Sequence, residues 1–156
     1  MKFAPLNRTS FWVVLAYFIS GTAIGFIFQI LLIRLGWPLI SGNYLIIALL
    51  VVLALYVLYR GLKVKRFLDG KLPDLSPFYA STTYIFAKSS IVTGWFLAGL
   101  YSGGIFVLAL QDSLNYLNYY WLINTLSAAS ALLLGILGLI SESYCKAPPP
   151  PSANPA

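Results

Sequence analysis

Lys88 and Glu142 are the two residues whose charge and position give this 156-residue chain its best chance of chemistry. Lys88 is the only cation set inside a long helix, and an ionisable group buried in a membrane needs a partner or an aqueous route. Counted at about 1.5 Å per residue, Lys88 lies about 33 Å from Leu110 and Glu142 about 35 Å from Tyr119. The two charges therefore reach the same depth, where they either form an ion pair or extend separately to the membrane surface.

Ser89 and Ser90 directly follow Lys88, so the three side chains and Glu142 define a candidate polar site that opens to the cytoplasm. An anionic ligand would suit Lys88. The alternative is that the two hydroxyls bond to carbonyl oxygens one helical turn back and so satisfy themselves. We favour this alternative, in which the two serine hydroxyls bond within their own helix.

The composition places these residues in a membrane and argues against catalysis. Apolar residues make up 60% of the chain and charged residues 9%, against about a quarter in an ordinary soluble domain. The chain has no histidine, one cysteine and four carboxylates, which excludes a histidine-ligated metal site, a Ser-His-Asp triad and an internal disulfide. We therefore expect no catalytic residue, no cofactor and no metal, and a protein that is not an enzyme.

Four apolar segments approach or exceed the length of about 20 residues that a membrane-spanning helix needs. They predict an all-α, transmembrane four-helix bundle over residues 1–146, with spans at about 11–33, 39–59, 78–110 and 119–141. The first segment is not expected to be a signal peptide, because apolar sequence resumes at once after its small residues. Residues 147–156 are proline-rich and are expected to form a disordered tail.

The cations predict the orientation of the chain. Half of the ten lysines and arginines lie between spans two and three. The positive-inside rule then places this connection and both termini in the cytoplasm, as expected of a multi-pass plasma-membrane protein. Near anionic lipid each such cation contributes about 1 kcal/mol, so membrane lipids are an expected partner and nucleic acid is not. The predicted lipid-contacting residues are Arg60, Lys63, Lys65, Arg66 and Lys71.

Small residues recur at helical spacing and predict where the helices pack, since helices in lipid associate where their backbones can approach closely. The third span carries two such stripes and is therefore expected at the centre of the bundle. A second copy of the chain, or another membrane protein, is a further candidate neighbour. The predicted packing residues are Gly21, Gly25, Gly94, Ala98, Gly99, Ser102, Gly103, Ser127, Ala131 and Gly135.

The second half of the chain resembles an actinobacterial family of small four-span membrane proteins of unknown function, often encoded beside folate-biosynthesis genes. The resemblance rests on residues 87–90, on Gly94 with residues 98–103, and on the E-x-x-C-[RK]-x-P ending at residues 142–148. It implies a multi-pass plasma-membrane protein without an assigned activity, whose characteristic residues include Lys88, Glu142 and Cys145. Cys145 itself is expected to be an unpaired thiol.

These observations favour a non-catalytic accessory or assembly protein that packs through its small-residue helix faces. The alternative is a small membrane transporter or ligand-binding module with its polar site around Lys88 and Glu142. Against transport, proton-coupled exporters need a carboxylate in the middle of the membrane, and the spans contain none before the inner end of the fourth.

Overall fold

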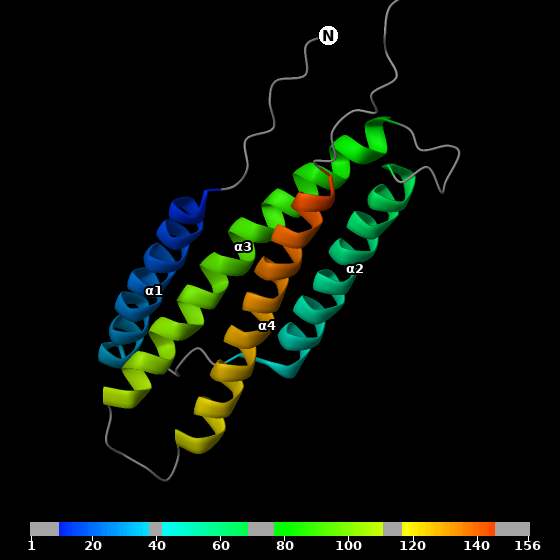
Figure 1. The fold of residues 1–156 in the computed structure, drawn as a ribbon. Coiled ribbons are helices and arrows are strands. Elements are labelled where there is room, and N and C mark those ends of the chain that lie inside the picture. Colours follow the sequence, from blue (N-terminus) through cyan, green and yellow to red (C-terminus); the bar gives the residue numbers. More distant parts are fainter. Residues whose placement is uncertain (1–9, 38–41, 69–76, 111–116, 146–156) are drawn as a thin grey trace, which may run out of the picture.

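Four long helices, with no strand among them, make up the part of the chain that the computed structural model describes, residues 10–37, 42–68, 77–110 and 117–145 (Figure 1). They are α1 (Phe11–Arg34), α2 (Tyr44–Leu68), α3 (Pro77–Leu110) and α4 (Leu117–Tyr144). Each contains a stretch that is long and apolar enough to cross a membrane. The predicted all-α fold with four potential membrane spans is therefore confirmed.

The second helix differs most from its predicted span. It begins at Tyr44, whereas the predicted span begins at residue 39, and it continues to Leu68, beyond the predicted end at residue 59. The extension forms because apolar residues go on recurring at helical spacing between the cations, and Val64 among them is buried. Four of the five predicted lipid-contacting cations therefore lie on a helix and not in a loop. Residues 39–41, Lys71 and the predicted tail at 147–156 lie outside the described residues.

The end of α1 is fixed by Gly36, which adopts the left-handed backbone conformation with φ +68°. The backbone N–H groups of Gly36 and Trp37 donate hydrogen bonds to the carbonyl oxygens of Ile33 and Leu32, at 3.1 and 3.0 Å. This pair of bonds is the Schellman motif, in which glycine is favoured because it has no Cβ. The carbonyl groups of Leu31, Leu32 and Ile33 are thus satisfied by the backbone itself.

The helices lie in the spatial order α1, α3, α4, α2, and α2 also touches α3 (Figure 1). Helices α1 and α3 run in one direction, and α2 and α4 run in the other. Among the described helices, α3 packs against all three others, whereas α1 packs against α3 alone. In their most apolar stretches, 50% of the residues of α3 and of α4 are buried, against 17% in α1. Helix α3 is therefore the centre of the bundle and α1 is its edge.

The core is built from small and branched side chains, while most large side chains point outward. One buried cluster joins α2, α3 and α4, and Ala54, Ala98 and Ala131 in it are 0% exposed. On the outside, Ile27, Val52 and many other large apolar side chains are exposed. Such an outer surface suits lipid, because a soluble monomer rarely exposes apolar patches larger than a few hundred Å². The members of the cluster are Leu50, Ala54, Val57, Ala87, Ala98, Ala131 and Leu134.

Candidate functional site

Helices α1 and α3 are held together by glycines on both helices. A methyl group at Gly99 would overlap the carbonyl oxygen of Phe18, and one at Gly21 would overlap the carbonyl oxygen of Phe96. Gly25 and Gly103 extend the same contact by one turn on each helix. Because the colliding atoms belong to the backbone, only glycine allows the two helices to lie this close.

A second close contact joins α3 to α4. A Cβ built at Gly94 would lie 2.8 Å from the Cα of Gly135, and Ala131 packs at the same level. The Trp95 indole covers Gly135, and its ring also meets Phe18 edge to face with 6.2 Å between the ring centroids. Trp95 thereby touches the helices on both sides of α3.

Two more of the predicted packing residues lie on α3 and α4. Ser102 is half-buried, and its hydroxyl group donates to the carbonyl oxygen of Ala98 at 2.7 Å. Ser127 is completely buried and meets Gly42, just before α2 begins. Ser127 thus lies at a contact between two parts of the chain, whereas the hydrogen bond of Ser102 stays within α3.

Serine and asparagine side chains distinguish the contact between α2 and α4. The Ser141 hydroxyl donates to the carbonyl oxygen of Val57 at 3.2 Å, in a buried position beside Gly61. The N–H of Gly42 donates to Asn124 Oδ1 at 3.3 Å. These hydrogen bonds attach α4 to the residue that lies just before α2 and to the middle of α2.

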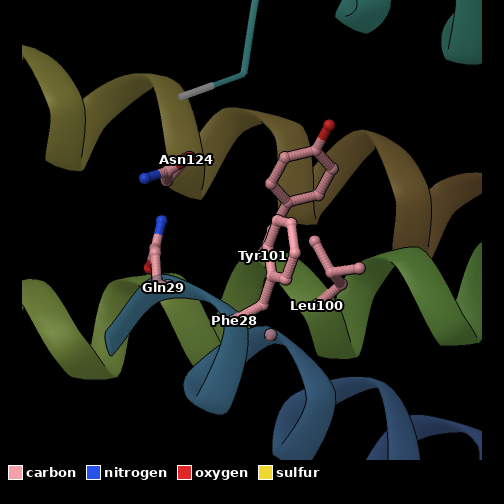
Figure 2. Close-up of a pocket in the computed structure, with 7 residues that line it drawn as sticks. Phe28, Gln29, Leu100, Tyr101 and Asn124 are labelled. Carbon is pink, nitrogen blue, oxygen red and sulfur yellow. The ribbon is translucent and has the colours of Figure 1, made fainter. Parts of the chain in front are cut away.

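A polar chamber, formed by Gln29, Tyr101 and Asn124, lies where α1, α3 and α4 approach one another (Figure 2). The Gln29 and Asn124 amides point toward one another across it, although α1 and α4 make no direct helix contact. Gly104 leaves room for Gln29, since a Cβ there would lie 2.7 Å from Gln29 Oε1. The remaining lining residues are Gly25, Phe28 and Leu100.

The size and the lining of the polar chamber limit what it can hold. Its cavity is about 20 Å³, which is enough for one water molecule. Both side chains are amides, which carry donor and acceptor atoms, and the Oδ1 atom of Asn124 already accepts the hydrogen bond from the N–H of Gly42. Such an arrangement can fix the relative positions of α1 and α4, but it cannot enclose an organic substrate.

The structure places Lys88 and Glu142 in different surroundings. Lys88 is exposed, and its Nζ lies 5.7 Å from the centroid of the Tyr84 ring, whereas Glu142 is buried. Their ion pair therefore stays a prediction. The hydroxyls of Ser89 and Ser90 both donate to the carbonyl oxygen of Phe86, at 2.9 and 2.8 Å, as the favoured interpretation of these serines expects.

Several cations lie over tyrosine rings toward the end of the bundle where α2 ends and α3 begins. Arg60 lies over the ring of Tyr79 with 4.7 Å to its centroid, and Lys65 lies at the same distance over Tyr144. Lys63 also reaches Tyr79, at 5.5 Å. Since aromatic rings of this kind collect at membrane interfaces, the arrangement suits contact with lipid headgroups. Arg66 is exposed at the same end.

Cys145 is a free, half-buried thiol just beyond α4. Burial raises the pKa of this thiol from its ordinary value of 9.0 to about 11, and the nearby Glu142 carboxylate contributes in the same direction. The thiol therefore stays protonated at neutral pH, and a protonated thiol is a poor nucleophile and a poor metal ligand.

Gln29 and Asn124 are not among the site residues predicted from the sequence, although counting residues along the spans would have placed them at the same depth. Gln29 lies five residues before the end of α1, and Asn124 seven residues after the start of α4. At about 1.5 Å per residue both sit about 8–10 Å from the same end of the bundle. Tyr101 carried no comparable signal, because tyrosine is common in this chain.

Comparison with known protein families identifies the family of the chain. The family model described as "Protein of unknown function (DUF3180)" covers residues 13–149, which is most of the chain and includes all four helices except the first two residues of α1. No curated protein and no solved structure matches the chain. The function therefore has to be argued from the geometry.

Proposed function

Because the chain belongs to the DUF3180 family, whose function is unknown, we propose that it is a non-catalytic accessory protein that assembles with another membrane protein. Its place is the plasma membrane, with both termini in the cytoplasm. This orientation is supported by Arg60, Lys63, Lys65 and Arg66, which gather at one end of the bundle. A close relation to the actinobacterial proteins encoded beside folate genes is part of the same proposal.

The observation that carries the proposal is the position of α1. This helix rests on α3 alone, and its buried residues Val14, Gly21, Gly25 and Gln29 all lie on one face. The rest of its surface is open to the membrane. An edge helix that is fixed by glycine contacts on one side presents a rigid surface on the other.

The outward face of α1 also has the residues that a helix partner needs. Ala16, Ser20 and Ala23 are exposed, and Ala23 is two residues from Gly21, which turns it about 200° away from α3. The Ser20 hydroxyl donates to the carbonyl oxygen of Tyr17 at 3.0 Å, so it presents little unsatisfied polarity to lipid. A stripe of small residues allows another helix to approach closely.

Co-purification of a tagged full-length chain from its native membranes tests this proposal. We expect a stoichiometric membrane protein, or an untagged second copy, to accompany the wild-type chain and to be lost from Ala23→Leu. The matched control is Ala48→Leu, which makes the same change at an exposed position of α2 and should retain the partner. A wild-type chain that purifies alone, or a partner that both variants retain, would show the proposal to be wrong.

A transporter or ligand-binding module is the second candidate function, and the burial of Glu142 favours it. A carboxylate that is 2% exposed at the end of a spanning helix is a candidate ion-handling group. This candidate predicts that Glu142→Gln abolishes uptake or release of an ion by vesicles containing the purified protein. If Glu142→Gln changes only the melting temperature, Glu142 has a structural role.

A further inference from the structure

A groove lies between the ends of α1 and α3, at the opposite end of the bundle from the clustered cations. It measures about 230 Å³ and is lined by Ile30, Ile33 and Arg34 of α1 and by Val107 and Leu110 of α3. Its walls are apolar, and among the described residues that line it the one charged group is the exposed side chain of Arg34. Since both helices end here, the groove sits at the level where hydrocarbon gives way to headgroups.

The Arg34 side chain is available for a ligand. A cation in the last turn of a helix often binds the final carbonyl groups, but here backbone N–H groups already occupy the carbonyl oxygens of Leu31, Leu32 and Ile33. In the described part of the chain the only carboxylate is Glu142, at the far end of the bundle. Asp112 follows Leu110 by two residues and lies outside the described residues.

We propose that this groove binds one phospholipid, whose phosphate contacts the Arg34 guanidinium and whose acyl chain lies along the apolar wall. Arginine suits a phosphate because its planar guanidinium can form two parallel hydrogen bonds. An anionic headgroup is preferred over a zwitterionic one, because a choline group would offset the attraction to Arg34. The site lies about two to three helical turns beyond Ala23, at the end of α1, whereas the proposed partner surface is formed by Ala16, Ser20 and Ala23.

The dimensions of the groove favour a lipid over a soluble ligand. Pockets for organic ligands usually enclose about 300 Å³ or more, whereas this groove is smaller and open along one side. A ligand that fits must therefore continue beyond the groove into the membrane. A phospholipid does so with the remainder of its chains.

Photoactivatable lipids locate the site. The full-length chain is placed in phosphatidylcholine vesicles that contain a small fraction of a photoactivatable probe lipid. The probe is either phosphatidylglycerol or phosphatidylcholine, and each carries a diazirine in one acyl chain. Labelled peptides are then identified by mass spectrometry. At residues 30–34 and 107–110 we expect about fivefold more labelling by phosphatidylglycerol. At Val52, on the exposed face of α2, the two probes should label equally.

Three variants test the role of the charge and the groove. Arg34→Gln should remove the fivefold preference, Arg34→Lys should retain part of it, and Leu110→Trp should reduce labelling by both probes by filling the groove. Arg34 and Leu110 are exposed, so none of these changes should alter the melting temperature. Equal labelling by the two lipids in the wild-type chain, or an unchanged preference in Arg34→Gln, would overturn the proposal. Loss of labelling on addition of soluble glycerol phosphate would assign the site to a free phosphate and would also overturn it.

Discussion

The helix pairs α1–α3 and α2–α4 both depend on glycine, but the atoms that the glycines meet are different. Gly21 and Gly99 lie against backbone carbonyl oxygens of the opposite helix. Gly42 and Gly61 lie against the serine side chains of Ser127 and Ser141. A serine can be replaced by a smaller residue, whereas a backbone atom cannot be removed. The α1–α3 contact is therefore the less tolerant of the two, although α1 is the more exposed helix.

This difference bears on function. An edge helix that is to bind a partner must be fixed in position without help from a second neighbour, and backbone contact through glycine provides this in lipid. Helix α2 has neighbours in both α3 and α4 and has hydrogen bonds as well. The comparison makes specific predictions about substitutions on each pair.

The largest effect is expected for Gly99→Leu, which should separate α1 from α3. The side chain would collide with the backbone of Phe18, and we expect a loss of about 3 kcal/mol or more. Thermal unfolding in detergent measures the loss. Ala109→Leu is the matched control, because it enlarges an exposed position on the same helix and should have little effect. Leucine is a better helix former than glycine, so a loss of stability in Gly99→Leu cannot come from helix propensity. Equal melting temperatures for the two variants would contradict the close α1–α3 contact.

A rescue experiment separates the two pairs. Gly61→Ala should cost about 1–3 kcal/mol, because its new methyl group meets Ser141. Adding Ser141→Gly should restore part of this stability by removing the obstructing side chain. Gly99→Ala combined with Phe18→Ala should show no such recovery, since the carbonyl oxygen at position 18 remains. Recovery in both double variants, or in neither, would remove the distinction between the pairs.

A smaller effect is expected when Ser141→Ala removes the hydroxyl group that binds the Val57 carbonyl oxygen. Hydrogen bonds between helices in a membrane contribute about 0.6 kcal/mol on average, so the melting temperature should fall slightly. Ser143→Ala is the matched control, because the exposed Ser143 hydroxyl donates to Ile140 on its own helix. A larger loss in Ser143→Ala than in Ser141→Ala would contradict the assignment.

Much of the fold can be predicted from the sequence, because length and hydropathy are enough to place a spanning helix. The glycines of the α1–α3 contact were also identified from their spacing. The ion pair of Lys88 with Glu142 stays a prediction, and it shows which information counting residues leaves out. Counting residues gives depth, but contact also depends on the angle around the helix, and Ala87 faces Gly138 while Lys88 is turned outward. Only the packing of α3 on α4 determines that angle.

The polar chamber is a second arrangement that counting residues does not predict. Gln29 and Asn124 share a depth that the sequence could have predicted. Their helices are not direct neighbours, however, so no rule about neighbouring spans would have paired them. The arrangement arises because Gly104 leaves space on α3 for the Gln29 amide.

The smallest effect concerns Cys145, at the end of α4. Because its pKa is raised to about 11, alkylation by a maleimide should be slow at neutral pH and should accelerate until the pH reaches about 11. The folded chain holds this proton more tightly than the unfolded chain, so the associated stability is present below about pH 9 and is lost as the pH rises through about 11. The unfolded chain in denaturant serves as control and should reach its plateau near pH 9. Coincident pH profiles would mean that the thiol is not buried in the folded chain.

Photo-crosslinking from the outward face of α1 tests the account most directly. With a benzophenone amino acid in place of Ser20, irradiation of native membranes should give a discrete protein adduct. The same amino acid in place of Ala48, on the exposed face of α2, should give lipid adducts only. Lipid adducts alone at both positions, or the same protein adduct from both, would contradict the claim that α1 is the partner-binding helix.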